Sequence, residues 1–367
     1  MNKKIIPISQ IILKVGLFLI ISSVICAQSK DSAATTNPLL INGMVDINFS
    51  KNFNNPASHT NGYRNFDVTE NQFDINLVKV TFQKIASPVG FRIDLAGGHA
   101  IDLVNSDVSL GSEKSLRNIE QAYLSAVIPV GNGLTINGGK MSTHMGAEVI
   151  ESAGNVNYSR SLLFTYAVPY FHLGAMASYP FNSQISATIY VYNGWNNIID
   201  NNNDKTLGAE FTWAPSPVFT FIQNWIGGPE EPNSTKKRHV FDSIINFQPT
   251  DELYFNFNFD YGQEAMTPSG YSIWKGAAVI GKYSIGQSSI IALRGEVYDD
   301  VNGFTTGITQ TLKEITFTYE YKFANSLITR LEFRRDWSNS AYSFEDRNGN
   351  LMKDNQNTFL IGSIYTF

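Results

Sequence analysis

The sequence predicts an all-β fold, namely a transmembrane antiparallel β-barrel of about sixteen strands with short periplasmic turns and long external loops. Three observations lead to this prediction. Apolar and polar residues alternate with period two as far as the last residue, short and long connections alternate along the chain, and the final strand ends on an aromatic residue.

The composition excludes several other classes of protein. The chain has 367 residues, of which 43% are hydrophobic, 13% aromatic and 16% charged, and its formal net charge is -5. A nucleic-acid-binding protein should show a basic patch, so no nucleic-acid partner is expected. The chain is too polar for a bundle of membrane helices, and its aromatic content is too high for a disordered protein.

Residues 1–27 have the features of a secretory signal peptide. Lys3 and Lys4 precede an apolar run over residues 15–25, and Ala27 provides a small residue for the signal peptidase. The apolar run is about half of the ~20 residues that a membrane-spanning helix needs. We therefore predict cleavage after Ala27.

Cleavage also removes Cys26, the single cysteine of the chain. The exported protein then has no disulfide, thiolate nucleophile or cysteine metal site. The alternative is a lipoprotein acylated on Cys26, which the bulky Ile25 disfavours. The loss of three leader lysines leaves 24 basic against 32 acidic side chains, a formal net charge of -8. Residues 28–37 are predicted to form a short exported linker.

The period-two signal is clearest over residues 253–261. Leu253, Phe255, Phe257, Phe259 and Tyr261 share one face, while the opposite face carries Tyr254, Asn256, Asn258 and Asp260. Residues 314–323 repeat the pattern. Amphipathic strands of about 10 residues have the length that crosses a bilayer in a barrel.

The connections between these strands fall into two classes. Seven short turns contain the Gly, Pro, Asn or Ser typical of tight hairpins, at residues 86–90, 129–133, 180–183, 214–217, 248–251, 284–287 and 324–326. Longer polar stretches lie near residues 50–70, 97–116, 142–169, 194–205, 227–238, 263–271, 299–311 and 338–356. Seven hairpins and one strand at each end make sixteen strands, and closure removes the open edges that hydrocarbon does not tolerate. A secreted sandwich or propeller is the soluble alternative, because it shows the same alternation.

Two observations favour the membrane barrel over the sandwich. Residues 359–367 end on Phe367, with Phe359, Ile361 and Tyr365 on one face, and resemble the terminal signal that the barrel-assembly machinery reads. Aromatic residues near strand ends are typical of the girdles at both membrane boundaries. These aromatics are Trp213, Trp225, Tyr254, Phe259, Tyr261, Trp274, Tyr283, Tyr298, Phe323 and Trp337. The expected location is the outer membrane of a Gram-negative bacterium, with its lipid and the assembly machinery as partners.

Charges of both signs occupy the polar face of the predicted strands, opposite Phe, Leu and Tyr. Unpaired charge is too costly in the core of a soluble sandwich, whereas a water-filled channel accommodates it and uses it to orient polar solutes. We predict as pore-lining residues Arg92, Asp94, Arg294, Glu296, Glu314, Glu320, Arg330, Glu332 and Arg334. The acidic exported chain favours cations weakly. The alternative is a plugged lumen in which these charges pair across strands.

The longest connection, residues 142–169, combines charged residues with an apolar segment. Glu148, Glu151 and Arg160 precede or flank Leu-Leu-Phe at residues 162–164. Such a segment would seek cover rather than remain in water. We predict that this third external loop folds into the lumen and narrows the pore, with a lid on the barrel rim as the alternative.

The same region carries a family resemblance. The motifs are GKMSTHMGAE at residues 139–148, NYSRSLLF at 157–164, Pro169 and YNGW at 192–195. They resemble the OmpL-like β-barrel porins, and NYSRSLLF is the most specific of them. The resemblance extends over nearly the whole exported chain and implies an outer-membrane barrel with porin activity and no assigned solute.

Catalytic and metal-binding motifs are absent from the sequence. His59, His99, His144, His172 and His239 stand outside H-E-x-x-H and G-x-S-x-G contexts, so no catalytic residue, cofactor or histidine metal site is predicted. Residues 200–204 and 346–354 space their oxygen ligands as calcium loops do. Both lack the glutamate expected at position 12, where Phe211 and Asn357 stand, so calcium binding is a hypothesis.

Together these observations predict one barrel domain over residues 38–367 that lets small polar solutes diffuse passively. A homotrimer is an expectation taken from general porins. The alternative is a plugged barrel that serves as a surface scaffold for attachment or partner binding. Conductance across a planar bilayer separates the two functions.

Overall fold

The computed structural model describes residues 37–106, 114–266, 269–324 and 326–367. The predicted signal peptide, and the predicted linker apart from Asn37, lie outside the described residues. Residues Leu39–Phe367 form one compact unit.

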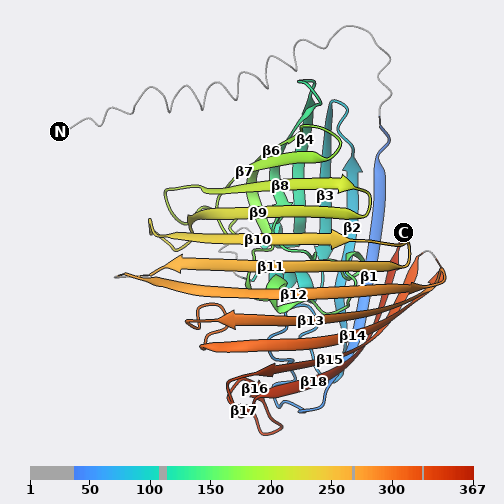
Figure 1. Cartoon of the computed structure of the whole chain (residues 1–367), viewed down its shortest axis with the longest axis vertical. Helices are drawn as coiled ribbons and strands as arrows, with labels where there is room; N and C mark the ends of the chain where they lie inside the picture. The colour runs from blue at the N-terminus through green and yellow to red at the C-terminus, as the bar shows by residue number, and fades with distance from the viewer. Residues whose placement is uncertain (1–36, 107–113, 267–268, 325) are drawn as a thin grey trace. The chain divides into compact units, whose positions relative to one another are not determined.

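Sixteen antiparallel strands close into a barrel in the order β1-β18-β15-β14-β13-β12-β11-β10-β9-β8-β7-β6-β5-β4-β3-β2 (Figure 1). Their bounds are β1 Leu40–Asn52, β2 Gln72–Lys84, β3 Val89–Gly97, β4 Ile119–Ile128, β5 Leu134–Ser142, β6 Phe171–Pro180, β7 Ile185–Tyr192, β8 Thr206–Ser216, β9 Phe219–Pro229, β10 Lys237–Phe247, β11 Leu253–Ala265, β12 Tyr271–Ile285, β13 Ser289–Asp300, β14 Gln310–Ala324, β15 Leu327–Ser338 and β18 Asn355–Thr366. The predicted fold class and strand number are confirmed.

Short elements decorate the long connections. A hairpin of β16 (Phe344–Glu345) and β17 (Leu351–Lys353) lies between β15 and β18. The helical turns are α2 (His99–Val104), η1 (Lys114–Asn118), η2 (Ser152–Gly154) and α3 (Leu162–Tyr166). Among the described residues, no helix is both long enough and apolar enough to cross a bilayer.

The first and last strands close the barrel. β1 pairs with β18 from Met44 opposite Thr366 to Asn52 opposite Thr358. Beyond this ladder, Gly43 and Phe367 exchange two backbone hydrogen bonds of 3.0 Å. A carbon added at Gly43 would lie 2.2 Å from the Phe367 ring, so the terminal aromatic packs where only glycine leaves room. Closure pairs the backbone groups that an open edge would expose to lipid.

The polar face of the strands is the inner face. In β11, Asn256, Asn258 and Asp260 are buried inside the barrel, while Phe257 and Phe259 lie exposed on its outer surface. This pattern is the inverse of a soluble sheet, and it matches a wall with lipid outside and polar groups within.

The aromatic girdle is only partly as predicted. Trp213, Tyr283 and Phe323 lie exposed on the outer face near the short turns. Trp274 and Tyr298, also assigned to the girdle from the sequence, are instead buried on the inner face, where they join the cluster under the third loop. The assignment was wrong because a position near a strand end does not say which face a side chain takes.

Candidate functional site: the lumen and its third loop

The third loop, residues 143–170, crosses the interior of the barrel. It starts and ends on neighbouring strands, since Ser142 of β5 pairs with Phe171 of β6 and the amide of Thr143 donates to the carbonyl of Tyr170 (3.0 Å). The ring order puts β13 and β14 opposite β5 and β6. The middle of the loop forms hydrogen bonds with residues of β13 to β15, which make up the far wall.

The loop is first stabilised by its own residues. The buried Arg160 guanidinium donates to the carbonyls of Val149 (2.9 Å), Tyr158 and Ile150. The Ser161 hydroxyl accepts from the amide of Phe164 (3.0 Å) and caps the first turn of α3. These local bonds give the loop a defined shape before it meets the wall.

The apolar segment of the loop is covered. Leu162, Leu163 and Phe164 are at most 2% exposed and pack with Phe66 and Trp274 in the main hydrophobic cluster. In a barrel with a polar inner face, this cluster provides the hydrophobic burial that holds the loop inside.

Arginines of the far wall bind the loop backbone. Arg330 donates to the carbonyls of Asn155 (2.6 Å), Ser152 (2.7 Å) and Asn157 (3.0 Å). Arg294 donates to the carbonyl of Ser159 (2.7 Å). Arg334 donates to the carbonyl of Arg160 (2.6 Å).

Each of these arginines also pairs with a carboxylate. Arg294 contacts both Glu314 of the wall (2.7 Å) and Glu148 of the loop (2.9 Å). Arg330 pairs with Glu320 (2.8 Å) and Arg334 with Asp336 (2.7 Å). Buried charge is tolerated here because each guanidinium has both a counter-charge and carbonyl acceptors.

Carboxylates of the wall accept the loop amides. Glu332 accepts from the amides of Tyr158 (2.7 Å) and Ser159 (3.0 Å). Glu296 accepts from the amides of Leu162 and Leu163, both at 2.6 Å, at the start of α3. These carboxylates replace the hydrogen bonds to water that the amides of an exposed loop would form.

Asp46 of β1, which the sequence reasoning did not single out, contributes a further contact. It accepts from the hydroxyls of Tyr158 (2.6 Å) and Ser152 (2.5 Å). Its position on the polar face of an alternating strand was the signal that could have identified it.

The predicted pore-lining residues all lie on the inner face, but their surroundings differ from the expectation of contact with pore water. Arg294, Glu296, Glu314, Glu320, Arg330, Glu332 and Arg334 are each at most 7% exposed because the loop covers them. Asp94 is buried as well, and Arg92 keeps a side-chain exposure of 27%. Alternation identifies the face of a residue but not what lies on top of it.

The predicted loop residues divide in the same way. Glu148 and Arg160 are buried in loop contacts, whereas the Glu151 side chain keeps 22% exposure and forms an ion pair with Lys79 of β2. The Lys79 ammonium also lies 3.0 Å from Glu120 and 3.1 Å from Asp94. The sequence reasoning did not identify Lys79 or Glu120. Each is a charged residue in an alternating strand, and that position was the signal that could have identified it.

The carboxylates around Lys79 have the spacing of a metal site. Oxygens of Asp94, Glu120 and Glu151 lie within 4.8 Å of one another. The ammonium of Lys79 supplies the positive charge at their centre, so this cluster is best described as a charged contact between β2, the neighbouring wall and the loop.

The wall that the loop leaves uncovered runs from β4 to β8. Glu120, Lys140 and Thr188 of this wall are buried, but several other inward side chains are half-buried, and of these Glu210 carries a charge. The half-buried side chains include Tyr123, Ser125, Asn137, Ser178, Tyr190, Glu210 and Thr212.

In the two candidate calcium loops, the aspartate carboxylates accept hydrogen bonds from backbone amides of the same loop. Asp346 accepts from the amides of Asn348 (2.8 Å) and Asn350 (3.0 Å). Asp200 accepts from the amide of Asn202 (3.0 Å) and pairs with Lys205. Calcium binding at either loop stays a prediction.

Tyr158 fits against the wall only because residue 362 is glycine. A carbon added at Gly362 would lie 2.4 Å from the Tyr158 ring. Gly362→Ala is therefore expected to displace the ring from Asp46 and to lower the free energy of unfolding by about 1–3 kcal/mol. Urea midpoints in detergent micelles measure this loss. Gly295→Ala is the matched control, since its added carbon meets nothing within 4 Å, and an equal loss in both variants would contradict the prediction.

We expect the start of the third loop to be sensitive to acid. His144 donates to the carbonyl of Trp225 (3.2 Å), and burial lowers the pKa of its imidazole from about 6.5 to about 4. Above pH 6.5 the ring is neutral whether folded or unfolded, so stability is unaffected there. As the pH falls from 6.5 to 4, mainly the unfolded chain gains the proton, so the free energy of unfolding is expected to fall by up to about 3 kcal/mol.

Urea midpoints at pH 7, 5.5 and 4.5 test this acid sensitivity. His144→Gln is expected to remove this part of the pH dependence, whereas His59→Gln, at an exposed histidine, should leave it unchanged. Identical pH profiles for the native chain and the His144 variant would contradict the assignment.

Comparison with known proteins identifies the family to which this barrel is similar. The family model described as "Putative beta-barrel porin-2, OmpL-like" matches residues 38–367. No curated protein matches the chain.

Solved structures share the fold at about one identical residue in ten. An anion-selective porin from Comamonas acidovorans has a TM-score of 0.65 at 10% identity, over 90% of this chain and 99% of that one. The outer-membrane channel DcaP of Acinetobacter baumannii has a TM-score of 0.62 at 10% identity, over 92% and 99%. The trimer form of OmpT from Vibrio cholerae has a TM-score of 0.57 at 10% identity, over 90% and 99%.

The family match covers the barrel from its first strand to its last residue, including the loop motif that suggested the resemblance. The chain belongs to the OmpL-like β-barrel porins and is a porin of the Gram-negative outer membrane, a channel for passive diffusion.

Proposed function

We propose that small polar solutes pass between the third loop and the inner face of β4 to β8, with the loop as the constriction. The observation that carries the proposal is the asymmetry of the inner wall. On the side of β13 to β15 the loop covers the charged residues, while several polar side chains of β4 to β8, among them Asn137, Tyr190 and Glu210, stay half-buried.

In this arrangement the buried arginines hold the loop rather than contact the solute. The guanidinium groups of Arg294, Arg330 and Arg334 donate hydrogen bonds to carbonyls of the loop and pair with carboxylates of the wall. Charges that stay partly exposed on the inner face include those of Arg92, Glu151, Glu210 and Lys322. The path is thus weakly charged, with both signs present, and suited to polar solutes of low charge.

Single-channel recording in a planar bilayer tests conduction and the assignment of charges together. The native protein should show stable conductance steps, and Arg92→Glu should shift the reversal potential in a salt gradient towards cation selectivity. Arg335→Glu makes the same charge change on the outer face and should leave the reversal potential unchanged. Silence from folded, inserted protein would instead support the plugged scaffold, and no shift on changing Arg92 would remove that residue from the path.

The partners expected from the sequence remain proposals. The exposed apolar outer face, with Phe257, Phe317 and Phe333 among its residues, would contact outer-membrane lipid. The strand that ends at Phe367 would be read by the barrel-assembly machinery. A homotrimer is supported by the trimer form of a structurally similar porin, and light scattering of the detergent-solubilised protein would measure the state. We also propose that the protein acts without a catalytic step, as a channel.

A further inference from the structure

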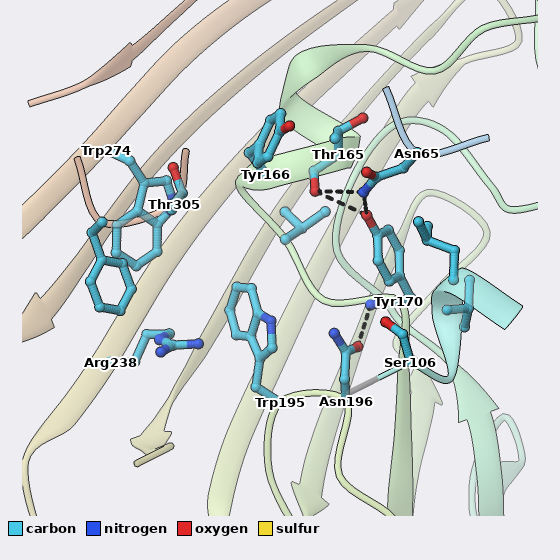
Figure 2. Close-up of a pocket in the computed structure, with 14 residues that line it drawn as sticks. Asn65, Ser106, Thr165, Tyr166, Tyr170, Trp195, Asn196, Arg238, Trp274 and Thr305 are labelled. Carbon is cyan, nitrogen blue, oxygen red and sulfur yellow. Dashed lines mark hydrogen bonds between the residues drawn. The ribbon is translucent and has the colours of Figure 1, made fainter. Parts of the chain in front are cut away.

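A cavity of about 450 Å³ lies at the long-loop end of the barrel (Figure 2). Its walls come from distant parts of the chain. Trp195 follows β7, Tyr166 belongs to α3 of the third loop, Trp274 lies near the start of β12, and Phe304 lies in the connection after β13. The cavity has the size and the mixture of rings and polar groups of a small-molecule site.

The ring of Trp195 is partly exposed and offers a flat apolar surface, whereas Trp274 is buried behind Phe304. Trp274 and Phe304 stack with centroids 5.5 Å apart and planes 15° from parallel. The Arg238 guanidinium lies 4.8 Å from the centre of the Trp195 ring and 5.2 Å from that of Phe304, which fixes both rings. A pyranose presents one face of C–H groups that packs on such a ring surface, while its hydroxyls point outwards in the ring plane.

Donors for those hydroxyls surround the rings. The Asn196 side-chain oxygen accepts from the amides of Tyr170 (2.7 Å) and Phe171 (3.3 Å), which orients the amide group and leaves its nitrogen as an available donor (Figure 2). Within the described part of the chain, the hydroxyl of Tyr166 and the indole N–H of Trp195 form no hydrogen bond. Polar groups at the edge of aromatic surfaces are suited to a ligand with both an apolar face and hydroxyls.

The cavity carries little net charge. Arg238 is the single charged side chain among the described lining residues. Its guanidinium is neutralised by Glu264 at 2.7 Å and lies 3.6 Å from Glu231. An anionic ligand would have to compete with these carboxylates, so the electrostatics favour a neutral one.

We propose that this cavity binds a neutral saccharide, with a sugar ring against Trp195 and its hydroxyls bonded to Asn196 and Tyr166. The saccharide is a disaccharide, whose two rings suit a cavity of about 450 Å³. The consequence of such binding rests on the proposed function. The cavity would concentrate the solute at the outer mouth of the channel, and the solute would then diffuse past the third loop.

Binding can be measured without conduction. Maltose, cellobiose, lactose and sucrose are titrated separately into the detergent-solubilised full chain, and tryptophan fluorescence and calorimetry report the complex. At least one sugar should bind with a millimolar dissociation constant. Trp195→Ala should weaken that binding about tenfold or more, and Tyr166→Phe, which removes only a hydroxyl, should weaken it about threefold to tenfold.

Trp213→Ala is the matched control, because Trp213 lies exposed on the outer face. It should leave sugar binding unchanged. Failure of all four sugars to bind a protein that still shows conductance steps would overturn the saccharide site and leave conduction intact. Binding of succinate in preference to the sugars would overturn the neutral-ligand inference. Sugar binding by a folded protein that shows no conductance would support the site and contradict the proposed path instead.

Discussion

Replacing residues 144–169 with an Asn-Gly turn is expected to raise the single-channel conductance at least about twofold, because the width of a pore limits its conductance. The replacement is compatible with the fold, since the loop begins and ends on paired strands, Ser142 facing Phe171 across the β5–β6 ladder. Asn-Gly forms the tight turn that joins such strands. Without the loop, the charges of β13 to β15 would meet water, which can solvate them in an open lumen.

The control is the same Asn-Gly replacement at residues 346–350, the tip of the β16–β17 hairpin, which is exposed to solvent. Its conductance should equal that of the native protein. An unchanged conductance in the third-loop variant, with folding verified by the heat-dependent shift of the barrel on gels, would rule out the loop as the constriction.

Arg330→Gln is expected to lower the free energy of unfolding by about 3 kcal/mol or more and to add brief closures to the single-channel record. The change removes three charged hydrogen bonds to the carbonyls of Ser152, Asn155 and Asn157 and leaves Glu320 without its buried partner. Losing one member of a buried ion pair costs about 3–5 kcal/mol. The freed segment around η2 can then move into the path beside β4 to β8.

Arg335→Gln is the matched control, because Arg335 lies on the same strand with its side chain exposed on the outer face. Urea midpoints and current noise should both stay at native values there. If Arg330→Gln matched this control in stability and noise, the contacts between the wall and the loop would not be what holds the loop in place.

Most of the fold could be predicted from short windows of sequence. Backbone preferences of Gly, Pro and Asn determine the turn at residues 129–133. The alternation over residues 253–261 places apolar side chains on one face and polar side chains on the other. Both are local properties of the sequence. Alternation also placed Arg294 and Arg334 on the correct face, since period two holds wherever one face is uniformly apolar. Alternation is uninformative in β12, because Val279 on the outer face and Ala278 and Ile280 on the inner face are all apolar. The face on which Trp274 lies could therefore not be predicted.

The candidate site was less predictable because its contacts join residues far apart in the chain. Tyr158 meets Asp46, Glu332 and Gly362, and no spacing in the sequence marks those partners. Likewise, Lys79 and Glu151 are brought together only when the loop descends into the barrel.

The sequence by itself determined the all-β class, the sixteen strands, the polar inner face and the family, because each follows from local periodicity, turn chemistry or a continuous motif. The tertiary structure decided which charges meet water. A loop that enters a barrel must find partners for its backbone groups, and the wall arginines and glutamates provide them. Those residues therefore became the support of the third loop, whereas several polar side chains of β4 to β8 stay half-buried.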